Sequence, residues 1–184
     1  MNSQTRDAGR LWLWATTGRH PHGTCVDVEI TATDDVLLVL KSLSAFGVGP
    51  DLDAAKVDER FRNEVARALG RVVDSAFRES AASVVDQCKD TALLIASRWI
   101  SQRSGDESVL AKDLAKVAEA LEGEAHKKYA AANQCKTLAI LHARGKSNEQ
   151  FSKGLRPSTE EDAEFAVHAV GFLLRELDWA LSTF

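Results

Sequence analysis

Residues 80–102, SAASVVDQCKDTALLIASRWISQ, establish the fold class expected for this chain. The apolar residues of this stretch recur at steps of three and four, which places them on one face of an α-helix. This stripe is broad enough to face a bundle core and comprises Ala81, Val84, Val85, Cys88, Ala92, Ile95 and Trp99. Gly105 follows shortly afterwards and is expected to end the helix. The sequence therefore predicts a long core helix.

The same helical spacing recurs on both sides of this stretch. Further helices are expected at residues 34–46, at 56–79 with a cap at Asp51 or Asp53, at 107–121, at 125–141 and from 158 onward. The last begins with the S-x-x-E pattern of a capping box at residues 158–161, and a loop is expected over residues 142–157. Phe165 and Tyr129 belong to the apolar stripes of the last two helices. Short connections favour antiparallel neighbours, so the predicted fold is mainly α, an up-and-down helical bundle.

The first residues follow a different pattern. Val26, Val28 and Ile30 alternate with polar residues, as in a half-buried β-strand. A second strand at residues 11–14 would complete a hairpin. We therefore expect an N-terminal arm or short β-hairpin at residues 1–33 and a helical bundle domain at residues 34–184.

Composition restricts the class of protein. The chain has 184 residues, 45% hydrophobic and 27% charged, with a net charge of -4, which is typical of one soluble globular domain. No stretch of about 18 residues is free of charge, so no membrane span is expected. The short apolar patch at residues 11–15 does not resemble a secretory signal, and cytoplasmic residence is expected.

The three cysteines do not form a recognisable motif. Cys25, Cys88 and Cys135 are far apart, odd in number and lack a C-x-x-C pair. This argues against a disulfide framework and against a four-cysteine zinc site. Only Cys135, which precedes Lys136, approaches the electropositive setting of a reactive thiol.

Positive charge is concentrated in residues 136–157, KTLAILHARGKSNEQFSKGLRP. This basic segment sets five cations against a single acid, Glu149, for a local charge of +4 in an acidic chain. The cations are Lys136, Arg144, Lys146, Lys153 and Arg156. Such a concentration favours an anionic partner.

Residues 80–178 resemble the C-terminal domain of abortive-infection proteins, a branch of the HEPN (higher eukaryotes and prokaryotes nucleotide-binding) superfamily. The resemblance rests on AASVVDQCKDTALLIASRWI at 81–100, AKDLAKVAEAL at 111–121, and HARGKS with LRPSTEEDAEFAVHAVGFLLREL at 142–177. Order and spacing agree as well as composition, and the HEPN-like core would extend to about residue 182.

The resemblance implies a helical bundle that dimerises and places two R-x(4 to 6)-H motifs in a cleft that cuts RNA without a metal. The matching residues here are Lys136 and His142, separated by five residues. It also implies a bacterial defence or toxin system, in which an antitoxin or another defence-system protein would be a partner.

The corresponding chemistry is metal-independent RNA cleavage without a cofactor. His142 would take the proton from a 2′-hydroxyl, with Lys136 as its catalytic companion, and DNA would be inert. The RNA or phosphate ligands would be Arg144, Lys146, Lys153 and Arg156.

A noncatalytic dimeric interaction module is the alternative, and it would bind an anionic ligand or a protein partner through the same segment. Lysine lacks the planar fork of arginine, so Lys136 in place of a catalytic arginine would preserve binding better than turnover. A histidine at a helix end is also commonly a C-terminal cap, and a basic loop is usually solvated.

A metal site and other enzyme classes have weaker support. His20, His22, Cys25 and Asp27 offer mixed zinc ligands, but their spacing matches no strong motif, and a polar loop tip explains the two histidines equally well. There is no Gly-rich phosphate loop of the kind that kinases or dinucleotide-dependent oxidoreductases use. No metal and no cofactor are therefore assigned.

Overall fold

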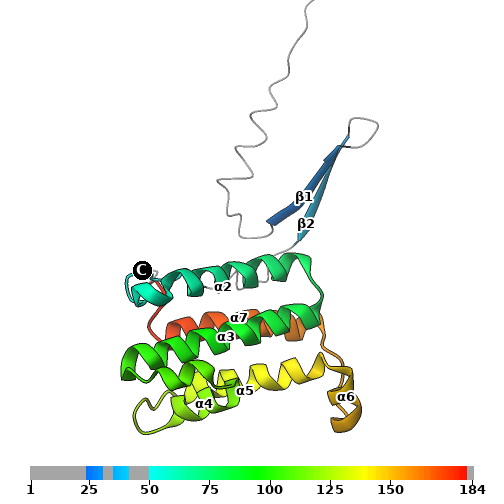
Figure 1. Ribbon diagram of the computed structural model, residues 1–184. Helices are drawn as coiled ribbons and strands as arrows, with labels where there is room; N and C mark the ends of the chain where they lie inside the picture. Colours follow the sequence, from blue (N-terminus) through cyan, green and yellow to red (C-terminus); the bar gives the residue numbers. More distant parts are fainter. Residues whose placement is uncertain (1–23, 31–34, 42–49, 182–184) are drawn as a thin grey trace, which may run out of the picture. The chain divides into compact units, whose positions relative to one another are not determined.

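The computed structural model describes residues 24–30, 35–41 and 50–181 (Figure 1). The chain divides into two units, residues 1–47 and 48–184. The first contains a β-hairpin and the second a helical bundle.

The hairpin joins β1, Thr24–Ile30, to β2, Val36–Lys41, in antiparallel register from Thr24 opposite Lys41 to Ile30 opposite Val36. The register shifts between Cys25 and Asp27. The strand predicted at residues 26–30 is confirmed, whereas the one predicted at residues 11–14 lies outside the described residues.

The helix predicted at residues 34–46 is wrong, because residues 36–41 form a strand. The run VLLVLK is apolar at nearly every position, and periodicity cannot separate a short run of this kind from a buried helix. The domain boundary expected between residues 33 and 34 would cut this hairpin. The two units divide after residue 47 instead.

The described part of the second unit is a mainly helical bundle, which confirms the predicted fold class. Its helices are α2 (Glu59–Arg78), α3 (Ala81–Ser104), the 3-10 helix η1 (Glu107–Ala111), α4 (Leu114–Glu122), α5 (Tyr129–Arg144), α6 (Ser147–Lys153) and α7 (Glu160–Glu176). The central helix is α3, which packs against α2, α4, α5 and α7 (Figure 1). No helix among the described residues is long and apolar enough to cross a membrane.

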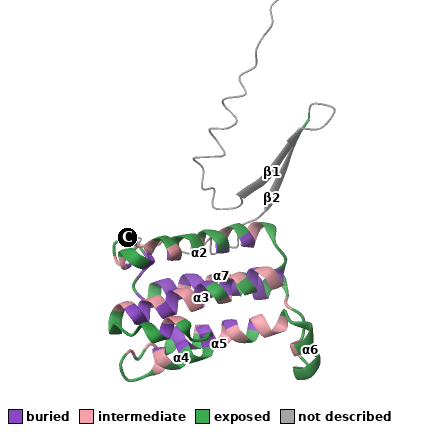
Figure 2. Cartoon of the chain, viewed as in Figure 1, coloured by how far each residue is buried: buried purple, intermediate pink, exposed green. Residues whose placement is uncertain are grey.

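Helix α3 occupies the centre because it is apolar on more than one side. All seven residues of its predicted stripe are buried, and Ala96 and Ile100 are buried as well (Figure 2). Ser80 caps its first turn, and Gly105 ends it with a left-handed φ of 72°. Both ends are therefore set by local sequence.

Aspartates cap several helices at positions that periodicity alone did not locate. Asp58, rather than Asp51 or Asp53, caps α2 and accepts the backbone N–H of Arg60 at 3.1 Å. Asp113 caps α4, so the segment predicted as one helix over residues 107–121 is divided into η1 and α4.

The later helices also differ in detail from the prediction. Helix α5 extends to Arg144, and α6 lies within the stretch expected to be a loop. The capping box of α7 is present but uses Thr159 and Asp162, one residue later than predicted. Tyr129 and Phe165 are 54% and 45% exposed, so neither belongs to the core.

Two extended segments join the ends of the bundle. Leu52 and Ala180 form an antiparallel bridge. Beside it, Asp53 donates its N–H to the Trp179 carbonyl and Leu181 donates to the Asp51 carbonyl, both at 2.8 Å. The segment before α2 therefore lies alongside the segment after α7.

Candidate functional site

The histidine of the basic segment lies against a carboxylate. His142 is in the last turn of α5, and its Nδ1 contacts Oδ1 of Asp86 on α3. The His142 side chain is 18% exposed, whereas that of Asp86 is 59% exposed. Nδ1 is buried and has no hydrogen-bond partner, so Asp86 meets the ring by close contact and not by a hydrogen bond. A carboxylate beside one ring nitrogen leaves the other nitrogen for a ligand.

Asp86 was not identified from the sequence. It follows the buried Val85 on α3 and lies far from His142 in the chain. The two meet because α3 packs against α5, and no spacing rule pairs residues on separate helices.

Lys136 is not beside His142 within one chain. A step of six positions along the α-helix leads from one to the other, which corresponds to about 120° around the axis and about 9 Å along it. The Lys136 Nζ binds Glu122 Oε1 at 2.5 Å, near the end of α4. The structure therefore does not bring the two predicted catalytic residues together in a single protomer.

Arg144 and Arg156 converge on one buried carboxylate. Arg144 Nη1 donates to Asp162 Oδ1 at 2.8 Å, and Arg156 donates to both oxygens of Asp162 at 2.6 and 2.8 Å. The Asp162 side chain is only 8% exposed. Burial alone would raise its pKa, but the Arg156 hydrogen bonds, the Thr159 N–H and the charges of both guanidinium groups outweigh burial and lower the pKa.

The remaining two cations lie around α6. Lys153 Nζ binds Glu149 Oε2 at 2.5 Å, one helical turn away. The hydrogen bond and charge of Lys153 lower the pKa of Glu149. Lys146 is exposed and has no ion pair with the described residues.

Four of the five cations in the basic segment are thus paired within the chain. When Glu122 and Asp162 are counted with the segment, its charge falls from +4 to +2. The attraction for an external anion is correspondingly weaker than the sequence suggested.

Exposed apolar side chains lie on the helices around this segment. Phe151 on α6 is 94% exposed. Tyr129 and Ile140 are 54% and 55% exposed, and their spacing of eleven residues places both on one face of α5. Lys136 falls on that face too, whereas His142 is on the other side of the helix.

Neither described cysteine is a reactive thiol. Cys88 and Cys135 are fully buried, and burial raises the pKa of each to about 12. The expectation that Cys135 approaches a reactive setting is therefore wrong, because its thiol faces the core while Lys136 points outward.

The histidines considered for zinc, His20 and His22, lie outside the described residues, as do the side chains of Cys25 and Asp27. Among residues 24–30, 35–41 and 50–181, no three His, Cys, Asp or Glu side chains gather as a metal site would require.

Comparisons with protein-family models, curated proteins and solved structures find no match. The resemblance to HEPN proteins therefore stays a prediction, and the function must be argued from the site.

Proposed function

We propose that the end of the bundle formed by the close of α5, α6 and the start of α7 binds RNA through its phosphates and cleaves it without a metal. His142, oriented by Asp86, would be the general base. The contact between these two residues carries the proposal. It agrees with the HEPN-like defence or toxin role that the family resemblance implies.

The chemistry follows from the position of the imidazole beside Asp86. With Nδ1 against the carboxylate, Nε2 can accept the 2′-hydroxyl proton as the 2′-oxygen bonds to phosphorus. The bond to the 5′-oxygen breaks, and water supplies a proton to the leaving oxygen. This step does not require Lys136, which lies on another face of α5.

Phosphate contacts would come from cations near His142 in the chain. Lys146 is exposed and free to bind, and Arg144 and Arg156 retain N–H donors beyond those that hold Asp162. Because Asp162 already occupies some of the N–H donors of each arginine, the affinity for RNA is expected to be modest and sensitive to salt. A homodimer would double the number of such contacts.

A second candidate is a noncatalytic interaction module, and the internal pairing of four cations favours it. In this case His142 and Asp86 would stabilise the packing of α5 on α3. The exposed Phe151 would contribute to a protein interface, for example with an antitoxin or another defence-system protein.

The decisive experiment is to incubate the purified protein with RNA and with DNA of the same sequence, in chelator. His142→Ala should reduce RNA cleavage by about 100-fold or more, and Asp86→Asn by about tenfold. Asp90→Asn is the matched control, since Asp90 is exposed one turn further along α3. DNA should remain intact.

RNA binding, measured by fluorescence anisotropy, separates the two candidates. Binding without cleavage in the wild type would favour the interaction module. If the wild type neither binds nor cleaves RNA, the proposal is wrong. Equal cleavage by the wild type and all three variants would identify a contaminating nuclease.

A further inference from the structure

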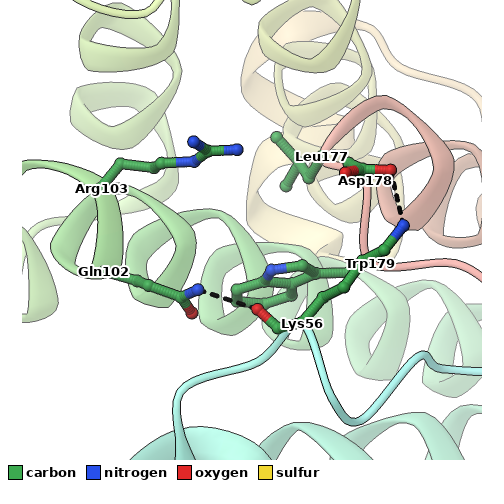
Figure 3. Close-up of a pocket in the computed structure, with 6 residues that line it drawn as sticks. All are labelled: Lys56, Gln102, Arg103, Leu177, Asp178 and Trp179. Carbon is green, nitrogen blue, oxygen red and sulfur yellow. Dashed lines mark hydrogen bonds and ion pairs between the residues drawn. The ribbon is translucent and has the colours of Figure 1, made fainter.

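A polar cavity that is largely open to solvent lies at the other end of α3, about 25 Å from Asp86 along the helix. Its volume is about 520 Å³, within the range of small-molecule sites. It is lined by Lys56, Gln102, Arg103, Leu177, Asp178 and Trp179 (Figure 3). None of these residues belongs to the basic segment.

The walls of the cavity are held by long-range hydrogen bonds. Gln102 accepts the Asp58 N–H at 3.0 Å and donates to the Lys56 carbonyl at 2.8 Å. Trp99 donates its indole N–H to the Leu177 carbonyl at 2.9 Å. These bonds fix the segments before α2 and after α7 to α3, so the cavity is preorganised.

Three cations and two carboxylates meet here, because Lys56 Nζ also lies 3.8 Å from Asp53 Oδ2. Lys56 binds Asp178 at 2.8 Å, and Figure 3 shows the side chain of Arg103 extending toward Asp178 and Leu177. The hydrogen bond and charge of Lys56 lower the pKa of Asp178, and Arg103 and Lys128 lower it further. With Asp53 and Asp178 counted against Lys56, Arg103 and Lys128, the site keeps a surplus of one positive charge.

Arg103 retains its hydrogen-bonding capacity. Its guanidinium carbon lies 5.5 Å from the centre of the Trp99 ring, but the group donates no hydrogen bond to any described residue. A guanidinium held by a ring with its N–H groups unused is suited to an oxyanion.

The backbone around the cavity is strained. Within the described residues, the non-glycine positions with positive φ are Lys127, at 53°, and Asp178, at 61°. Asp178 lines the cavity, and Lys127 precedes Lys128, whose Nζ donates to the Glu176 carbonyl at 2.6 Å. Strained residues of this kind persist where the surrounding structure holds them, and they cluster at ligand sites.

We propose that this cavity binds a small phosphate monoester. Arg103 and Lys56 would bind the phosphate, and Lys128 would add favourable charge. Asp178 would accept a hydrogen bond from a hydroxyl of the ester. The proposal is independent of RNA cleavage, because the cavity shares no residue with the His142 site.

The test is calorimetric titration of the full-length protein with inorganic phosphate and with AMP at low salt, with ¹H–¹⁵N spectra to locate the site. Both ligands should bind saturably and shift the Arg103 and Trp179 signals. Arg103→Gln should weaken binding about tenfold, while Arg103→Lys should retain part of it. Arg71→Gln, an exposed site on α2 outside the cavity, should bind as the wild type does.

Asp178→Asn provides a test of opposite sign. Asparagine tolerates the left-handed backbone and removes the negative charge, so inorganic phosphate should bind several-fold more tightly. Circular dichroism of each variant would verify that it is folded. The absence of saturable binding, equal affinity in Arg103→Gln and the wild type, or weaker phosphate binding by Asp178→Asn would overturn the proposal.

Discussion

Arg156 donates to both carboxylate oxygens of Asp162, and the same carboxylate accepts the backbone N–H of Thr159 at 3.1 Å. One buried acid therefore caps α7 and also fixes the end of the basic segment. Arg144 adds a fourth hydrogen bond to it from the end of α5. The cations that first suggested an anionic partner thus hold three elements of the bundle together.

Replacement of this acid should destabilise the bundle. Asp162→Asn removes the charge that both arginines bind and is expected to lower the free energy of unfolding by about 2 kcal/mol. Urea denaturation followed by circular dichroism measures the change. Glu160→Gln, at an exposed position in the first turn of α7, should cost less than about 0.5 kcal/mol, and a similar cost for both variants would contradict this account.

Acid should abolish the difference in stability between the wild type and Asp162→Asn. The folded-state pKa of Asp162 is below its unfolded value, so its carboxylate stabilises the fold above the unfolded pKa of about 4. This contribution is lost as the pH falls through the folded pKa. Urea midpoints of the two proteins should converge below about pH 4, and a constant difference down to strong acid would refute the assignment.

The buried thiols should react only on unfolding. Burial raises the pKa of Cys88 and Cys135 to about 12, so neither forms thiolate at pH 8 in the native state. In a Cys25→Ser background, a thiol-specific chromogenic reagent should modify neither cysteine in buffer and both in concentrated urea. Rapid modification of the native protein would show that the core opens more readily than its packing indicates.

Substitution of two glycines by alanine should change the stability of the protein in opposite directions. Gly105 has a φ of 72°, so Gly105→Ala should destabilise the protein by about 1 kcal/mol. Gly70 lies inside α2 with open space where a Cβ would be, and Gly70→Ala should stabilise it by about 0.8 kcal/mol. Thermal unfolding of both variants measures the two effects, and shifts in the same direction would be inconsistent with these backbone roles.

The parts of the fold that could be predicted from sequence are those that local patterns specify. Helix α3 was predicted with seven of its buried residues, because its period is regular and Gly105 ends it. Strand β2 was predicted as a helix, because its apolar run has no distinguishing period. Asp113 divides η1 from α4 by capping, an effect that the hydrophobic pattern does not reveal.

The candidate site was harder to predict because its partners come from other elements. The basic segment was recognised, but the acids that neutralise it, Glu122 and Asp162, lie outside it in the chain. Asp86 meets His142 only through the packing of α3 on α5. Charge counted along a sequence omits such pairings, so it overestimated the positive potential of this segment.

The bridge between Leu52 and Ala180 has a consequence for protein engineering. Because these two positions are adjacent, a short linker between the segments that contain them could close the bundle into a ring. New termini could then be opened at the exposed turn around Gly105, giving a circular permutant with the same helical core. The same adjacency would allow the bundle to be inserted as a cassette into a surface loop of another protein.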